Sequence, residues 1–85
     1  MKLKDNFVTF GSDENVMMVS ADGKDFSGVL KGNGTVGFIL SLLKTETSRE
    51  NIVSSLLGEY EVSREIAEQD TDRVLETLRS INALE

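Results

Sequence analysis

The residue pattern of this chain changes abruptly at Gly32 and Asn33. Before this point, short runs rich in β-branched and aromatic residues alternate with Gly- and Asp-containing turns. After it, apolar residues recur at helical spacing to the end of the chain. Because 85 residues are too few for two independent cores, we expect a single domain over residues 1–85. It should have an α+β fold, with a β-meander in residues 1–31 and three helices in residues 32–85.

Three short strands are expected in the first part, in residues 6–10, 15–20 and 26–30. The first two are separated by a polar turn in residues 11–14, and the next turn contains Asp22 and Gly23, a pair that tight hairpins favour. Gly28 is weak in the middle of a strand, so it indicates a bulge or a close backbone approach. The expected sheet is therefore a three-stranded antiparallel meander.

Each expected helix begins after a side chain that can accept a hydrogen bond from the first helical turn, namely Asn33, Ser48 and Ser63. Gly37, inside the first helix, suggests close packing against the sheet, and Asn82 should end the third helix in the left-handed conformation. Three helices behind a meander form the architecture of a winged helix-turn-helix. The expected apolar faces comprise Val36, Phe38, Ile39, Leu40, Leu42 and Leu43, then Ile52, Val53, Leu56, Leu57 and Tyr60, then Ile66, Val74, Leu75, Leu78 and Ile81.

The composition argues against catalysis. The chain has no histidine and no cysteine, so the usual proton shuttles, thiolate nucleophiles and thiolate metal sites are missing. The acidic residues are scattered, with neither metal-ligand nor calcium-loop spacing, and the glycines form neither of the common phosphate-binding motifs. We therefore expect no enzymatic activity, no metal and no cofactor.

Charge is distributed unevenly along the chain. Residues 1–44 carry five lysines against five acidic residues, whereas residues 45–85 carry four arginines against ten, so the whole net charge of −6 lies in the helical part. An acidic surface repels phosphate backbones. No secretory signal or membrane-spanning run is visible, so we expect a cytoplasmic protein that binds neither nucleic acid nor membrane.

Two features could belong to a binding site. Asp70 is a carboxylate on the otherwise apolar face of the third helix, either as a boundary residue that reaches water or as a group available to a ligand. The strand in residues 26–30 could accept an added strand if it lies at the sheet edge. It could equally be an ordinary edge blunted by the charges of Lys24, Asp25 and Lys31.

The helical part resembles the PqqD-like family, whose domains are also called RiPP recognition elements. The family carries a junction of the form Leu-Asn-x-Thr-Gly-x-Phe-x-Trp-x-Leu-Leu, a run Ile-Val-x-x-Leu-x-x-x-Tyr-x-Val and a later segment Asp-Val-x-x-Phe-Leu-x-x-Leu. Matching residues in register are Asn33, Thr35, Phe38, Leu42 and Leu43, then Ile52, Val53, Leu56, Tyr60 and Val62, then Asp70, Leu75 and Leu78, with Asn82 in place of the closing glycine.

The resemblance implies a non-catalytic chaperone for a ribosomally made precursor peptide. Such domains bind the leader of the precursor as an added strand against the third helix. They present it to a modifying enzyme, often a radical SAM protein, as in pyrroloquinoline quinone biosynthesis. Transferred to this sequence, the peptide-binding residues would be Asp25, Phe26, Ser27, Gly28, Val29 and Leu30 on the strand, with Asp70, Arg73, Val74, Thr77 and Leu78 on the helix.

Two other functions stay open at this point. A winged helix that binds DNA should present arginine or lysine on its recognition helix. Here the third helix carries Arg64, Arg73 and Arg79 among five acidic residues. A structural adaptor or oligomerisation domain could use the strand edge for self-pairing, which would give a homodimer.

Overall fold

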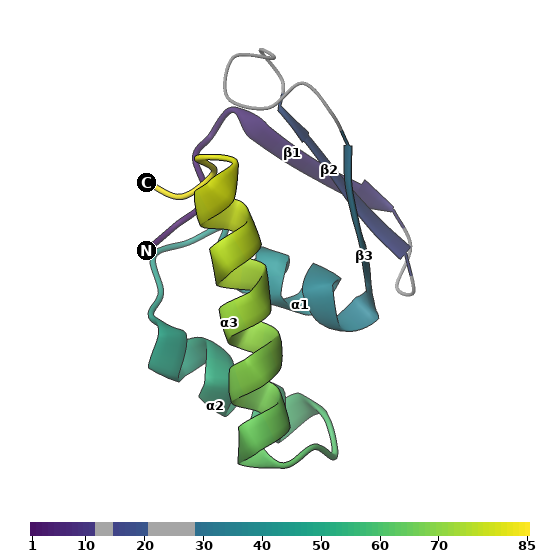
Figure 1. The fold of residues 1–85 in the computed structure, drawn as a ribbon, viewed down its shortest axis with the longest axis vertical. Helices are drawn as coiled ribbons and strands as arrows, with labels where there is room; N and C mark the ends of the chain where they lie inside the picture. The colour runs from purple at the N-terminus through teal and green to yellow at the C-terminus, as the bar shows by residue number, and fades with distance from the viewer. Residues whose placement is uncertain (12–14, 21–28) are drawn as a thin grey trace.

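The computed structural model describes residues 1–11, 15–20 and 29–85, with the backbone alone at positions 29 and 30. It confirms the predicted fold, three antiparallel strands followed by three helices (Figure 1). The sheet has the order β1-β2-β3, so each strand pairs with its neighbour in the sequence. The elements are β1 (Phe7–Gly11), β2 (Asn15–Ser20), β3 (Val29–Asn33), α1 (Gly34–Leu42), α2 (Arg49–Glu59) and α3 (Arg64–Ser80).

The third strand departs most from its predicted position. β2 has the predicted bounds and β1 lies one residue later than expected, but β3 continues to Asn33 instead of ending at position 30. Pairing explains the extension, since Lys31 and Gly32 lie opposite Met17 and Val16 of β2. Tertiary pairing here outweighs the low strand preference of a Lys-Gly-Asn sequence. Positions 26–28 of the predicted strand, and the centres of both predicted turns, lie outside the described residues.

The helix boundaries follow the predicted caps. The Asn33 side chain accepts a hydrogen bond from the Val36 amide at 3.1 Å, and Ser48 and Ser63 cap α2 and α3 in the same way. Asn82 has a φ of 57°, the left-handed conformation expected after the end of α3. Local chemistry therefore sets where each helix begins and where the last one ends.

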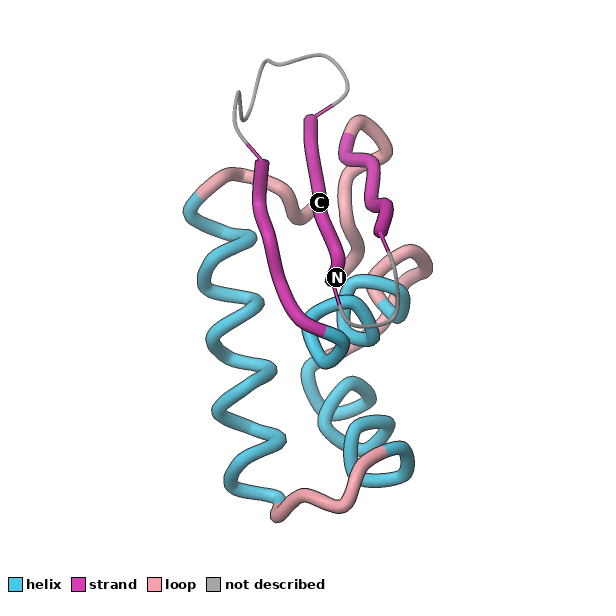
Figure 2. The backbone as a smooth tube through the Cα atoms, turned by 90° about the vertical axis from the view of Figure 1, so that its right-hand side faces the viewer, coloured by secondary structure: helices cyan, strands magenta, loops and turns pink. Residues whose placement is uncertain are grey.

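All three helices lie on one side of the sheet, and α1 contacts β2, β3, α2 and α3 (Figure 2). A Cβ atom at Gly37 would meet the Val16 side chain at 3.4 Å, which confirms the predicted close packing of α1 on the sheet. The core consists of Leu3, Phe7, Met18, Ile39, Leu40, Leu43, Ile52, Val53, Leu56, Ala67, Val74, Leu75, Leu78 and Ala83.

The buried face of α3 differs from the predicted one at its N-terminal end. Ile66, predicted to be apolar core, is 45% exposed, while Ala67 and Thr71 are buried. The face that packs against the other helices is therefore rotated by one residue relative to the predicted stripe in the first two turns. From Val74 onward the predicted and observed faces coincide.

The two ends of the described chain lie side by side (Figure 1). Leu3 and Leu84 form an isolated antiparallel bridge, and the Lys4 amide donates to the Ala83 carbonyl at 2.8 Å. None of the helices in the described ranges is long and apolar enough to cross a membrane.

Candidate functional site

The open edge of β3 lies next to α3 (Figure 2). β3 is the last strand of the sheet and pairs with β2 on one side. At this edge, β3, α1 and α3 enclose a cavity of about 160 Å³. Its lining residues are Lys31 of β3, Val36 of α1, and Arg73, Val74 and Thr77 of α3. We call this cavity and the adjoining edge of β3 the β3–α3 groove.

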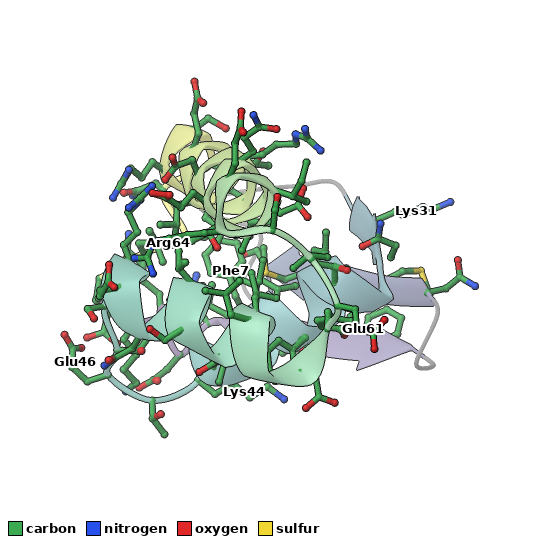
Figure 3. All side chains as sticks on the ribbon, turned by 90° about the horizontal axis from the view of Figure 1, so that it is seen from below. Phe7, Lys31, Lys44, Glu46, Glu61 and Arg64 are labelled. Atoms are coloured by element: carbon green, nitrogen blue, oxygen red, sulfur yellow. The ribbon has the colours of Figure 1, made fainter. Side chains whose placement is uncertain are left out.

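The groove has an apolar floor and a polar rim. Val36 is partly buried and Val74 almost completely buried, so both offer apolar surface from below. Lys31 and Arg73 stand at the rim. The Arg73 side chain is 75% exposed, and the Lys31 side chain extends away from the sheet (Figure 3). A small apolar side chain placed on this floor would lie beside the Arg73 guanidinium. The Lys31 ammonium lies toward the other face of the sheet, because the next residue, Gly32, faces Val36.

Gly32 explains why Val36 can form part of the floor. A Cβ atom at Gly32 would lie 2.5 Å from the Val36 side chain, closer than real Cβ atoms approach. The missing side chain therefore lets the first turn of α1 close onto the backbone of β3. This contact joins the edge strand to the helix that follows it.

Asp70 lies at the boundary of the groove but does not line the cavity. Its side chain is 33% exposed, and its carboxylate is 3.8 Å from the Arg73 guanidinium, one helical turn away. The carboxylate thus lies close to one rim cation and remains accessible to water. Thr77, one turn further along, donates its hydroxyl to the Arg73 carbonyl at 3.0 Å.

On the side of α3 toward α2, ion pairs join the two helices. Arg49 bonds Asp72 through two nitrogens, at 2.6 and 3.0 Å, and Arg64 bonds Glu50 at 2.7 Å. The hydrogen bond from Arg49 holds the pKa of the Asp72 carboxyl below its ordinary value, and the same bond raises the pKa of Arg49. These solvent-exposed contacts join α3 to α2 on the side of α3 away from the groove.

The structure brings together three of the five helix residues proposed for the site: Arg73, Val74 and Thr77. Leu78 requires a correction, because it is fully buried in the core and cannot contact a ligand. Val36 takes its place in the floor.

On the strand side, the backbone of Val29 and Leu30 lies on the edge strand. Asp25, Phe26, Ser27 and Gly28 lie outside the described residues.

Sequence reasoning missed Lys31 and Val36 as lining residues. Both follow from the extension of β3 to Asn33, which places Lys31 within the edge strand. The sequence did contain a signal for this extension. Asn33 caps α1, and a strand that runs directly into a helix, without a connecting loop, must continue up to the cap residue.

The groove offers binding chemistry. Its side chains supply the Arg73 cation, a hydroxyl and an apolar floor, and an edge strand can pair with an extended peptide through main-chain hydrogen bonds. Within the described part of the chain, no group of three or more acidic side chains is arranged to hold a metal ion.

Comparison with known proteins agrees with this geometry. The family model for coenzyme PQQ synthesis protein D (PqqD) matches residues 14–84. The fold is similar to that of TbiB1, solved in complex with the TbiA(beta) leader peptide, with a TM-score of 0.81 and 27% sequence identity. That match covers 100% of this chain and 95% of TbiB1. No curated protein matches the sequence. Because the family model spans most of the chain, this protein belongs to the PqqD family.

Proposed function

We propose that this protein binds the leader of a ribosomally synthesised precursor peptide as an added strand on β3, in the β3–α3 groove. The observation that carries the proposal is the open edge of β3 beside a groove with an apolar floor. The similar fold of TbiB1, whose structure contains a leader peptide, supports it. Main-chain pairing would supply affinity regardless of sequence, and the groove side chains would supply specificity.

In this proposal the strand residues 25–30 pair with the leader, and Arg73, Val74 and Thr77 contact its side chains. Lys31 and Val36 join them from the opposite wall. Asp70 acts through Arg73, whose guanidinium lies close to its carboxylate. An acidic leader residue in the groove would gain from Arg73, and one that points to the other face of the sheet would gain from Lys31.

The protein itself would perform no chemistry. It would hold the leader and present the precursor to a modifying enzyme, such as a radical SAM protein, in the cytoplasm where the precursor is made. This division of labour is consistent with a sequence that contains neither histidine nor cysteine.

The test is a titration of isotope-labelled protein with the precursor peptide encoded beside its gene, followed by NMR. We expect saturable shifts concentrated on residues 25–33 and on the groove-facing side of α3. Arg73→Glu should weaken binding of an acidic leader by roughly tenfold or more, because it reverses a rim charge. Arg79→Glu, the same charge change at an exposed position of α3 outside the groove, is the matched control. Shifts confined to β1 or α2 would contradict the proposal.

A further inference from the structure

The opposite edge of the sheet is bordered by a larger open trough. Two cavities, of about 710 and 270 Å³, lie along β1 and share Thr9 and Lys44. The larger one is lined by Thr9, Phe10 and Gly11, and the smaller one by Phe7, Val8 and Thr9, so together they follow β1 from end to end. We call the two cavities together the β1 trough.

The lining shows that the trough borders the strand edge and continues beneath the helix-facing side of the sheet, where Val16 of β2 and residues of α1 also line the larger cavity. Consecutive residues of a strand point to opposite faces. Cavities lined by consecutive residues of β1 therefore reach its backbone edge. β1 is the first strand in the sheet order and pairs with β2, so an extended segment placed in the trough lies at pairing distance from its open edge.

One end of the trough is aromatic. Phe10 is 48% exposed, although it is a large apolar side chain. Phe38 of α1 and Tyr60, which follows α2, line the helix side of this edge, with ring centroids 5.7 Å apart in edge-to-face contact. Phe10 borders the edge from the other face of the sheet, because it pairs with Met17, between the helix-facing Val16 and Met18. Such a corner suits an aromatic or large aliphatic side chain of a partner.

Lys44 lies where the two cavities meet. It lines both of them, and its ammonium group makes no ion pair within the described ranges. The other charged lining residues lie in one cavity each: Glu59 in the larger, and Lys4 and Asp5 in the smaller. Four other cationic side chains of the described residues have carboxylate partners: Lys2, Arg49, Arg64 and Arg73. An unpaired lysine at the centre of a strand-binding trough is complementary to a carboxylate on the incoming segment.

We propose that an extended segment of the modifying enzyme binds in the β1 trough, with an aromatic or large aliphatic side chain in the aromatic corner and a carboxylate beside Lys44. This inference rests on the proposed function, because a protein that presents a leader must contact enzyme and leader at the same time. The leader would pair with β3, and β1 lies two strand spacings away, about 10 Å, at the other edge. Both partners can therefore be bound together.

Charge argues against a second copy of this chain as the occupant. Two copies pairing β1 to β1 would be related by a two-fold axis through the middle of the strand. Thr9 and Lys44 lie at that middle, where the two cavities meet. The axis would thus bring the two Lys44 side chains close together, and their like charges would repel. An enzyme segment with a carboxylate would instead attract Lys44.

The test measures binding of two partners to the same variants by calorimetry: the peptide-modifying enzyme encoded beside the gene, and the precursor. Lys44→Glu and Phe10→Ser should each weaken enzyme binding by about tenfold or more, because charge reversal and loss of an aromatic anchor are costly at an interface. Both variants should bind the precursor with an affinity within about twofold of the wild type, because Lys44 lies on the side of the molecule away from Lys31 and α3 (Figure 3). Unchanged precursor binding would also show that both variants are folded.

Matched controls come from other surfaces. Lys31→Glu makes the same charge change in the β3–α3 groove, so it should weaken precursor binding and leave enzyme binding unchanged. Ile66→Ser removes an apolar side chain of similar exposure on α3 and should leave enzyme binding unchanged.

Four results would overturn the proposal. Three concern the partners: no enzyme binding at all, enzyme binding that is insensitive to both trough variants, or precursor-induced NMR shifts along β1. The fourth is a concentration-dependent dimer that both variants abolish, which would favour a second copy. If the enzyme binds through the trough but the precursor does not bind, the inference stands and the proposed leader function fails.

Discussion

Thr71 is the one polar side chain among the buried residues of the described part of the chain. It lies on the inner face of α3, and its hydroxyl has no hydrogen-bond partner among the described residues. A buried hydroxyl without a partner costs free energy, because it has lost its bonds to water.

We expect Thr71→Val to stabilise the protein by about 1 kcal/mol, since valine has nearly the same shape and removes the unsatisfied hydroxyl. The measurement is the free energy of unfolding in urea. Thr77→Val is the control, because the Thr77 hydroxyl donates to the Arg73 carbonyl and is only partly buried. Equal effects of the two substitutions would show that the hydroxyl of Thr71 finds a partner in solution.

Gly32 and Gly37 should respond oppositely to alanine. At Gly37 the added methyl would be in ordinary contact with Val16, at 3.4 Å, and would gain up to about 1 kcal/mol of helix propensity. At Gly32 it would overlap the Val36 side chain, at 2.5 Å, and force apart β3 and α1. Thermal unfolding should show Gly37→Ala as neutral or stabilising and Gly32→Ala as destabilising. A stable Gly32→Ala variant would mean that Val36 can move aside.

At the scale of the elements, α2 and α3 are joined by a charged contact as well as by the core. Arg49, the first residue of α2, reaches Asp72 in the middle of α3. This hydrogen bond lowers the pKa of Asp72 in the folded state. The contribution to stability is therefore complete above the pKa of an unfolded aspartate, about 4. It is lost as the pH falls through the lower pKa of the folded state.

We therefore expect Arg49→Gln to flatten the dependence of stability on pH in the acid range. The wild-type protein should lose more of its urea resistance between neutral pH and about pH 3 than the variant does. Lys44→Gln removes the same charge from a residue without an ion pair in the described ranges, so its pH profile should keep the wild-type slope. Parallel profiles for wild type and Arg49→Gln would show that the pair contributes nothing in solution.

At the scale of the whole molecule, residues 1–44 are neutral overall and residues 45–85 carry the net charge of −6. Two of the three arginines of α3 are already paired: Arg64 with Glu50, and Arg73 with Asp70. The helix that would enter a DNA groove in a winged helix-turn-helix is thus acidic overall and has few cations to spare for phosphates.

We expect no submicromolar binding to duplex DNA at about 150 mM salt, and any weaker binding should vanish as salt is raised. Fluorescence anisotropy with a labelled duplex measures this, with the labelled precursor peptide as the positive control for active protein. Sequence-selective binding that survives at this salt concentration would restore the DNA-binding alternative.

The sequence alone determined the order and type of the elements, because these depend on local chemistry. The side chains of Asn33, Ser48 and Ser63 mark the helix starts, and Asn82 the end of the last helix, through hydrogen bonds or backbone preferences within a few residues. Family membership could also be inferred at this level, since the motif residues keep their register along the chain.

Tertiary structure alone decided which residues form the groove. β3 reaches Asn33 because β2 pairs with it, and this extension brings Lys31 to the edge beside Val36. Leu78 and Thr71 are buried, and Ile66 is exposed, because the sheet and the other helices fix the rotation of α3. Periodicity gives an apolar stripe to within about one residue, or 100° of helix rotation. On α3, core residues and groove residues are neighbours in the sequence, so an uncertainty of one residue is enough to confuse them. Only the packing of α3 against the other elements decides which residue faces the groove.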